Sequence, residues 1–183
     1  SFVITPNHTS YLDPFVVAAA LDDRALQRVH WAGWTGVAFR NPVMRFFSRL
    51  AQAVPVEPER AALSSLAFGV SILRRGDILV WFPEGGRSKS GKLEPFKPGI
   101  GILLAAQPVL VIPVYIHGAF EALPPGSGMV RFRKITIVFG KRIDAHDLFE
   151  TENLSASPER IRKDLERSVD RLGEEFRQKR QLP

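Results

Sequence analysis

A histidine and a carboxylate five residues apart can form a general base near the start of this chain. His8 and Asp13 stand in the run Asn7–Pro14, shortly after the apolar stretch Phe2–Ile4. On a continuous helix five positions give about 500° of rotation, so the two side chains meet only if the backbone turns between them. In such a turn the carboxylate can accept a hydrogen bond from one ring nitrogen and leave the other nitrogen basic. A loop histidine beside a local capping carboxylate would have the same spacing.

A second polar motif, Phe82–Ser88, directly follows the strand-like run Asp77–Trp81. It holds a carboxylate, two glycines, a guanidinium and a hydroxyl, namely Glu84, Gly85, Gly86, Arg87 and Ser88. Ligands of open α/β sheets bind at the carboxyl ends of strands. The glycines let the backbone approach a ligand, the guanidinium can bind a phosphate bidentately, and the carboxylate can accept from a hydroxyl.

Further cations surround the second motif. Lys89, Lys92 and Lys97 bring the total, with Arg87, to four cations within eleven residues. Such a concentration favours an anionic ligand. A Gly-Gly turn with a surface Glu-Arg pair is the alternative interpretation of the motif taken alone.

The two motifs resemble those of the glycerolipid acyltransferase family, which includes lysophosphatidic acid acyltransferases. Four blocks stand in the family's order between residues 7 and 116: the His-x4-Asp pair of His8 and Asp13, Phe82–Ser88, Phe96–Gly99 and Val111–Tyr115. Each block is modestly specific, and the ordered set is far more specific.

The resemblance implies that a fatty acyl group moves from a thioester of coenzyme A or acyl carrier protein to the free hydroxyl of a lysophospholipid. The favoured acceptor is 1-acylglycerol-3-phosphate, with glycerol-3-phosphate or a lysophosphatidylethanolamine-type acceptor as alternatives. The family needs no cofactor and no metal. A non-catalytic lipid- or acyl-carrier-binding module and a hydrolase that activates water are the other interpretations.

The resemblance also implies a role for each matching residue. His8 would deprotonate the acceptor hydroxyl, and Asp13 would orient and stabilise it. The expected substrate-binding residues are Glu84, Gly85, Gly86, Arg87, Ser88, Arg60, Lys97 and Pro113. A helix expected to begin near Thr9 and Ser10 would offer free backbone N–H groups to the developing oxyanion.

Two positions depart from the family pattern. Gly86 stands where the family usually has threonine, which removes a hydroxyl donor and puts the substrate, but not the chemistry, in question. Pro58 occupies a position that is usually arginine. Arg60, two residues on, either reaches the same phosphate or is an ordinary exposed arginine.

The composition indicates one globular domain that favours anionic partners. The 183 residues are 45% hydrophobic and carry a net charge of +6. The absence of cysteine excludes a disulfide framework and a cysteine nucleophile, and the four histidines lack zinc-binding spacings. The cations are dispersed and match no nucleic-acid motif, so a lipid surface explains the charge more economically.

No run approaches the ~20 apolar residues that span a bilayer, so we expect peripheral contact with a membrane. Candidate contact residues are Trp31, Trp34, Phe39, Phe46 and Phe47, with Arg40, Arg45 and Arg49 between them. A helix packed on the sheet would show the same pattern. We expect a single acyltransferase domain over residues 1–183, a fragment of a longer chain without upstream membrane-contacting helices. It would act at the cytoplasmic side of the membrane, peripherally or anchored through segments absent here.

The pattern of elements predicts a three-layer α/β domain whose mixed, mostly parallel central sheet is flanked by helices. Predicted strands cover residues 2–5, 28–32, 53–56, 77–82, 109–116 and 130–139. Predicted helices cover residues 14–22, 42–51, 60–75, 98–106 and 158–179. The last strand alternates and should lie exposed or at an edge. The last helix should be capped by Ser157, with Pro158 in its first turn.

Overall fold

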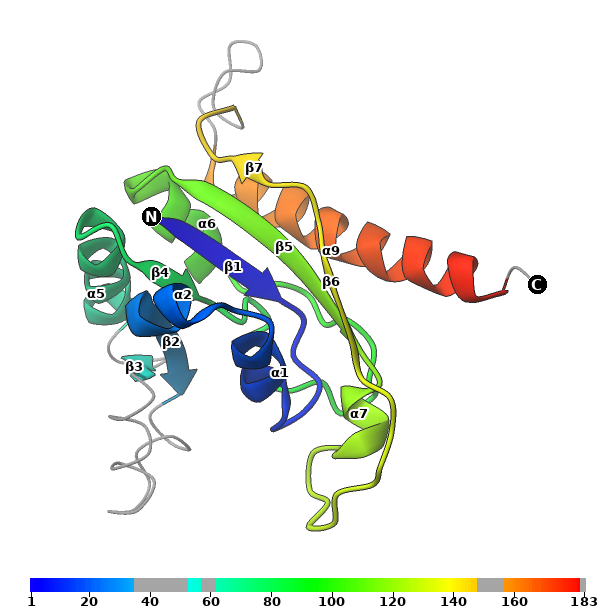
Figure 1. The fold of residues 1–183 in the computed structure, drawn as a ribbon. Coiled ribbons are helices and arrows are strands. Elements are labelled where there is room, and N and C mark those ends of the chain that lie inside the picture. Colours follow the sequence, from blue (N-terminus) through cyan, green and yellow to red (C-terminus); the bar gives the residue numbers. More distant parts are fainter. Residues whose placement is uncertain (35–52, 57–61, 148–156, 182–183) are drawn as a thin grey trace.

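The computed structural model describes residues 1–34, 53–56, 62–147 and 157–181 (Figure 1). The strands are β1 (Phe2–Pro6), β2 (Val29–Trp34), β3 (Ala53–Val56), β4 (Ile78–Val80), β5 (Leu110–His117), β6 (Thr136–Phe139) and β7 (Ile143–Asp144). The helices are α1 (Asp13–Ala19), α2 (Asp23–Arg28), α5 (Ala62–Arg74), α6 (Gly99–Ala106), α7 (Ala119–Ala122) and α9 (Pro158–Gln181).

One mixed sheet organises the described residues. Its strand order is β3-β2-β4-β1-β5-β6, and β7 pairs with β5. The pairs from β3 to β5 are parallel, whereas β6 and β7 run antiparallel to β5. The predicted mixed, mostly parallel sheet is therefore confirmed. Because β4, β1 and β5 are neighbours, the loops that follow them leave the sheet at the same edge.

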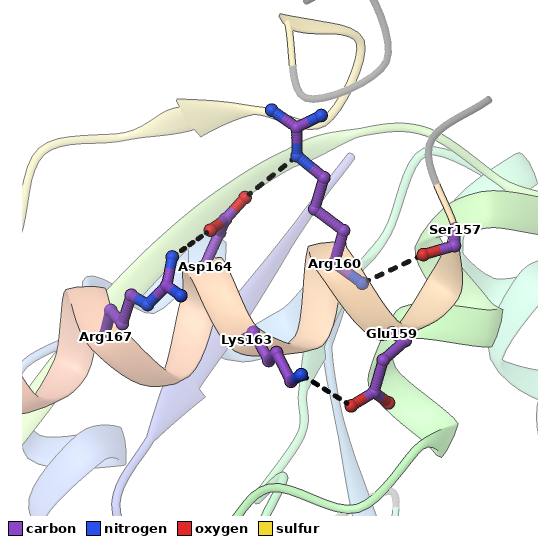
Figure 2. Close-up of a pocket in the computed structure, with 6 residues that line it drawn as sticks. All are labelled: Ser157, Glu159, Arg160, Lys163, Asp164 and Arg167. Carbon is purple, nitrogen blue, oxygen red and sulfur yellow. Dashed lines mark hydrogen bonds and ion pairs between the residues drawn. The ribbon is translucent and has the colours of Figure 1, made fainter. Parts of the chain in front are cut away.

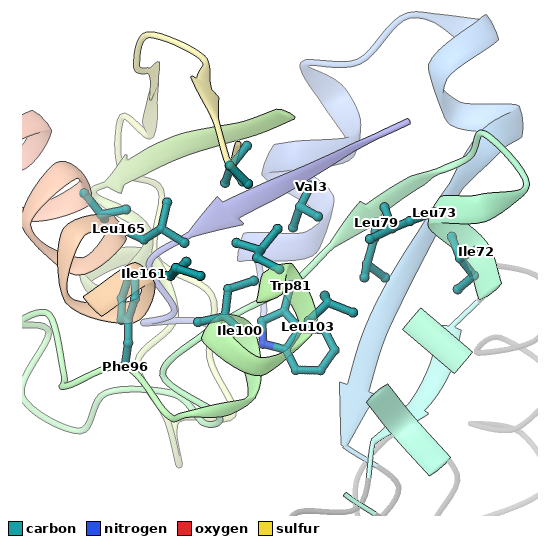
Figure 3. Close-up of a cluster of buried hydrophobic side chains, with 14 residues drawn as sticks. Val3, Ile72, Leu73, Leu79, Trp81, Phe96, Ile100, Leu103, Ile161 and Leu165 are labelled. Atoms are coloured by element: carbon teal, nitrogen blue, oxygen red, sulfur yellow. The ribbon is translucent and has the colours of Figure 1, made fainter. Parts of the chain in front are cut away.

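The alternation of side chains along β1 separates two apolar layers. Val3 belongs to a cluster with buried residues of α5, α6 and α9, whereas Ile4 belongs to a cluster that includes Val17 of α1. Figure 3 shows the first cluster, to which α6 contributes Ile100 and Leu103 and α9 contributes Ile161 and Leu165. Helices thus cover both faces, as expected for a three-layer domain.

Two glycines allow α9 to pack closely. A Cβ at Gly101 of α6 would lie 1.9 Å from the carbonyl oxygen of Pro158. At Gly173 a Cβ would lie 2.8 Å from the Tyr115 ring of β5. Side chains at these positions would push the helix away from the rest of the core, so glycine sets the distance between these elements.

The predicted elements agree with the structure except at a few segments. The predicted strand 130–139 was wrong over residues 130–135, since regular pairing starts only at Thr136; β6 does lie at the sheet edge. The helix expected over 14–22 ends at Ala19, and α2 begins anew after Asp22, whose carboxylate accepts from Ala25 N at 2.7 Å. The short β7 and α7 were not predicted, and the predicted helix 42–51 lies outside the described residues.

The first turn of α9 matches the sequence signals. The Ser157 hydroxyl oxygen accepts a hydrogen bond from Arg160 N at 3.3 Å, and Pro158 is the first helical residue. The buried stripe runs through Ile161, Leu165 and Val169. The expected cap is therefore confirmed, and the buried stripe turns toward the core.

Candidate active site

The loop between β1 and α1 is fastened to β5 by a buried asparagine. Asn7 Oδ1 accepts from Ile116 N at 2.6 Å, and Asn7 Nδ2 donates to Ile116 O at 3.1 Å. Ser10 adds a second attachment, because its hydroxyl donates to Leu123 O at 2.8 Å just beyond α7. Both side chains are buried, so water competes little for these hydrogen bonds. The bonds therefore hold the loop after β1 in place.

His8 and Asp13 meet within this fixed loop. His8 Nδ1 lies 2.9 Å from Asp13 Oδ2, and the carboxylate is fully buried. The same oxygen accepts from Thr9 N at 2.6 Å and from Ser10 N at 2.7 Å. Two backbone donors and the ring therefore hold one carboxylate oxygen. These contacts fix the orientation of the Asp13 side chain at the N-terminus of α1.

The contact with a carboxylate sets the tautomer of the histidine ring. A carboxylate oxygen accepts, so Nδ1 carries the hydrogen and Nε2 keeps a free lone pair. The ring also stacks on Phe82, with centroids 4.2 Å apart and planes at 30°. The side chain is 17% exposed. His8 is thus oriented by contacts on two sides and still reaches solvent, as a general base must.

The oxyanion donors expected near Thr9 and Ser10 are not free. Their N–H groups donate to Asp13, and α1 begins at Asp13 rather than at these two residues. That part of the sequence-based expectation was wrong. The physical reason is that the turn of the chain brings the Asp13 carboxylate within hydrogen-bond distance of both N–H groups. They therefore bond to Asp13 and are not available to a substrate.

The second motif is tied to the peptide groups of His8. Glu84 Oε1 accepts from His8 N at 2.5 Å, and Ser88 N donates to His8 O at 2.8 Å. Glu84 Oε2 accepts from Glu94 N at 2.8 Å. Both ends of one residue's backbone are therefore held by the loop that follows β4, and the two motifs form one unit.

Burial dominates the ionisation of Glu84. Its side chain is almost fully enclosed, and desolvation raises its pKa to about 8. The hydrogen bonds from the backbone of Glu94 and His8 oppose this shift but are weaker. The sequence-based role of Glu84, accepting from a substrate hydroxyl, stays a prediction, whereas its contacts in the structure are with the protein backbone.

Arg87 stacks on an aromatic ring from the first motif. Its guanidinium carbon lies 3.4 Å from the centroid of the Tyr11 ring, a cation–π arrangement. Its Nη1 is buried and has no hydrogen-bond partner among the residues that the structure describes. An unsatisfied donor of this kind is costly unless an anion binds there. Sequence reasoning missed Tyr11, although an aromatic residue three positions after His8 was a usable signal.

The glycines and Lys97 form the outer part of the loop. Gly85 has a φ of +72°, a conformation that favours glycine, and a Cβ there would lie 3.0 Å from Lys97 Cγ. A Cβ at Gly86 would meet nothing within 4 Å. Lys97 is exposed, and its backbone N–H donates to Pro83 O at 2.7 Å. The aliphatic stem of Lys97 thus lies on the motif, and the expected role of Lys97 in binding an anionic ligand stays a prediction.

Pro113 and Arg60 are the two remaining candidate residues. Pro113 is buried in β5, paired with Thr5 and packed against Gly140. Pro113 thus lies within the sheet, and its expected place near the acyl or acceptor site stays a prediction. Arg60 lies outside the described residues.

A depression of about 390 Å³ on α9 is remote from these motifs in the sequence and is lined by paired charges (Figure 2). Asp164 contacts both Arg160 and Arg167, and Lys163 contacts Glu159. These charges satisfy one another, which agrees with the prediction of a solvated helix face. Within the described part of the chain no cluster of three or more potential metal ligands occurs.

Residues 1–117, which contain all four blocks of the motif set, match the family model named Acyltransferase. The chain belongs to the Acyltransferase family. The resemblance expected from the His-x4-Asp pair and the Phe82–Ser88 motif is thereby confirmed.

Curated relatives in this family carry one recurrent name. A chloroplastic 1-acyl-sn-glycerol-3-phosphate acyltransferase of Brassica napus is 28% identical over 144 residues, covering 77% of this chain and 40% of its own length. A 1-acyl-sn-glycerol-3-phosphate acyltransferase of Bacillus subtilis is 25% identical over 179 residues, covering 93% of this chain and 84% of its own length. The chain spans about two fifths of the length of its plant chloroplast relatives.

A solved structure supports the fold. The crystal structure of the 1-acyl-sn-glycerophosphate acyltransferase PlsC from Thermotoga maritima matches with a TM-score of 0.76 and 24% identity. The match covers 97% of this chain and 66% of that one. Among the helices that the structure describes, none combines the length and apolar character needed to cross a membrane.

Proposed function

We propose that this chain transfers a fatty acyl group from a thioester, carried by coenzyme A or acyl carrier protein, to the free hydroxyl of 1-acylglycerol-3-phosphate. The observation that carries the proposal is that an oriented histidine base and an arginine with a hydrogen-bond donor left free by the described residues lie in two loops that are bonded to each other. His8 is held by Asp13 at 2.9 Å. Arg87 stands one residue before Ser88, whose N–H donates to the His8 carbonyl, and one buried guanidinium nitrogen of Arg87 has no partner in the described part of the chain.

His8 supplies the base for this reaction. Nε2 takes the proton of the acceptor hydroxyl as its oxygen attacks the thioester carbon. The C–S bond then breaks, and the imidazolium returns the proton to the leaving thiolate. A positioned base contributes ~10²- to 10⁴-fold to such a step. Asp13 stabilises the positive ring while the proton is held, and no protein nucleophile or metal takes part.

Arg87 supplies the recognition of the acceptor phosphate. A guanidinium can bind two phosphate oxygens at once, and here its face rests on Tyr11. The stacked ring limits the conformations of the guanidinium before substrate binds. Lys97, whose stem lies on Gly85, adds a second positive charge nearby.

Glu84 positions His8 in this proposal. Its two oxygens hold the His8 and Glu94 N–H groups, so it fixes the base relative to the loop that carries Arg87. The choice of a lysophospholipid as acceptor rests on the names of the relatives, and it places the reaction at the surface of a membrane.

The test is an acyl-transfer assay with the 183-residue chain. Labelled acyl-coenzyme A or acyl carrier protein is offered with 1-acylglycerol-3-phosphate, glycerol-3-phosphate or lysophosphatidylethanolamine, and products are identified by mass spectrometry. The proposal expects diacylglycerol phosphate from the wild type and none from His8→Ala. The matched control is His30→Ala, because His30 also contacts an aspartate, Asp77 at 3.4 Å, outside the site.

Three outcomes would contradict the proposal. Equal transfer by His8→Ala and the wild type would show that His8 is not the general base. Release of free fatty acid alone, without esterified product, would indicate a hydrolase. Binding of lipid or acyl carrier protein without any product from a folded chain would indicate a binding module.

A further inference from the structure

An ordered but fully solvent-facing segment lies beside the site. The segment Met129–Lys134 follows α7, and each of its six residues is exposed. Phe132 is 100% exposed, Met129 73% and Val130 55%. Single exposed apolar residues are ordinary, but three within four positions leave a contiguous apolar surface in water. The function proposed above gives this surface no role.

The segment is held in place by the protein. Arg131 N donates to Ala122 O at 2.8 Å, and the Ser127 hydroxyl contacts both N and O of Met129. At the other end, the carbonyl of Lys134 approaches Gly118 so closely that a Cβ on Gly118 would lie 2.2 Å from it. The exposure of the apolar side chains is therefore a property of a fixed loop.

This loop is connected to both motifs of the candidate active site. Leu123 stands where the loop begins, and its carbonyl oxygen accepts a hydrogen bond from the Ser10 hydroxyl. Phe120 of α7 packs on Gly91 in the loop after β4, where a Cβ would lie 2.8 Å from the ring. Figure 1 shows α7 and the following loop at the same end of the molecule as α1, where Phe15 is also 71% exposed.

The charge around the segment has one sign. Between Glu121 and Asp144 the chain has no acidic residue, whereas it has five cations, Arg131, Arg133, Lys134, Lys141 and Arg142. Three of these cations stand within the segment itself, next to Phe132. Apolar side chains between cations match the two layers of an anionic bilayer surface, acyl chains below negative headgroups.

We propose that Met129–Lys134 is a membrane-docking loop that inserts Phe132 among the headgroups of an anionic bilayer and holds the site against its lipid acceptor. The inference deepens the proposed function and relies on it for the lipid nature of the acceptor. A protein partner would need an acidic and apolar groove in place of a lipid surface, and the test below separates the two.

The absence of cysteine from the chain makes a site-specific probe straightforward. Phe132→Cys carries a nitrobenzoxadiazole label. The matched control is Phe68→Cys, since Phe68 is also an exposed phenylalanine, at 47%, but lies on α5. Vesicles contain phosphatidylglycerol and phosphatidylethanolamine, or phosphatidylcholine alone. We expect a blue shift and rise in emission at position 132 with anionic vesicles only, reduced by added salt, and no change at position 68.

The charges are tested by vesicle sedimentation. The double substitution Arg131→Gln/Arg133→Gln should lower the partition coefficient on anionic vesicles on the order of 30-fold. The control, Arg171→Gln/Lys179→Gln on the exposed side of α9, should lower it far less. Phe132→Ser should lower transfer to 1-acylglycerol-3-phosphate in vesicles roughly tenfold and leave transfer to a short-chain, water-soluble 1-acylglycerol-3-phosphate unchanged.

No spectral change at position 132, or equal changes at positions 132 and 68, would overturn the docking loop. Binding that is indifferent to lipid charge would do the same. The binding readouts need no acyl transfer, so the two proposals fail separately. Vesicle binding through Phe132 without any acylated product contradicts the proposed reaction alone. Acyl transfer without a change in emission of the label at position 132 contradicts the docking loop alone.

Discussion

At the scale of single residues, the site depends on one oxygen atom of one carboxylate. Asp13 Oδ2 accepts from the His8 ring and from two backbone N–H groups, whereas Oδ1 is buried and no described residue donates a hydrogen bond to it. The loop geometry and the tautomer of His8 therefore depend on the same atom. A substitution at Asp13 should separate these two roles if it keeps the oxygen and removes the charge.

Asp13→Asn is expected to lower kcat roughly 10³-fold, with little change in the acceptor KM. The amide oxygen can still accept the backbone donors, but it does not stabilise the positively charged ring. Steady-state acylation kinetics measure the effect. Asp77→Asn, at the other histidine–aspartate contact, is the control and should leave kcat unchanged. A normal kcat in Asp13→Asn would contradict the assigned role.

Tyr11→Ala is expected to raise the KM for a phosphate-bearing acceptor about 5- to 30-fold, because the guanidinium of Arg87 loses the ring beneath it. Tyr11→Phe keeps the ring and should behave like the wild type. The comparison substrate is a monoacylglycerol, which has no phosphate. An equal loss with both acceptors would show that Tyr11 does not act through phosphate recognition.

At the scale of elements, α9 supports the site from outside. Phe96 N donates to Glu166 Oε2 at 2.9 Å, and Arg162 Nη1 donates both to Phe96 O and to the same glutamate, each at 2.9 Å. The block that precedes α6 is thus held by polar groups of α9, in addition to the apolar packing. The loop after β4 is consequently fixed at both ends, by His8 and by α9.

The packing of α6 on α9 requires glycine at position 101. Gly101→Ala is expected to lower the free energy of unfolding by about 2–3 kcal/mol, because the new Cβ meets the backbone carbonyl of Pro158, which has no side-chain freedom to move away. Gly86→Ala is the matched control and should stay within about 0.5 kcal/mol, since its Cβ enters open space. Urea unfolding measures both, and equal stabilities would contradict the packing argument.

At the scale of the whole molecule, the topology of the sheet brings the functional loops together. β4, β1 and β5 are neighbours and parallel, so the Phe82–Ser88 motif, the His8–Asp13 loop and α7 all emerge at one edge. This agrees with the rule that ligands bind at the carboxyl ends of such strands. The proposed docking loop extends the same edge toward a bilayer.

The global stability should depend on pH through Glu84. Its pKa rises from 4.5 in the unfolded reference to about 8 in the fold, chiefly because burial disfavours the charged form. Its contribution to stability is therefore fully present below about 4.5 and is lost as the pH rises through about 8. We expect the unfolding free energy of the wild type to fall across this window by a few kcal/mol at most, relative to Glu84→Gln.

Urea titrations at several pH values between 5 and 8 measure this dependence. Glu121→Gln serves as the control, because Glu121 is an exposed carboxylate on α7 and its removal should leave the wild-type slope unchanged. Parallel pH profiles for the wild type and Glu84→Gln would show that burial does not shift this group as described.

The sequence by itself determined the strands, the long helices and the identity of the motif residues. The apolar run Phe2–Ile4, the breaker residues after it and the capping serine before α9 are local patterns, and local patterns follow from backbone geometry. The same patterns misassigned residues 130–135, because alternating apolar and basic residues fit a strand and an exposed loop equally well.

Only the tertiary structure decided which groups meet. The hold of Glu84 on the His8 backbone, the stacking of Arg87 on Tyr11 and the occupation of the Thr9 and Ser10 donors by Asp13 depend on three-dimensional placement. The His8 and Glu84 contact joins residues 76 positions apart, and its existence follows from the strand order β4-β1-β5. Strand order results from packing of the entire chain, so no short stretch of sequence encodes it.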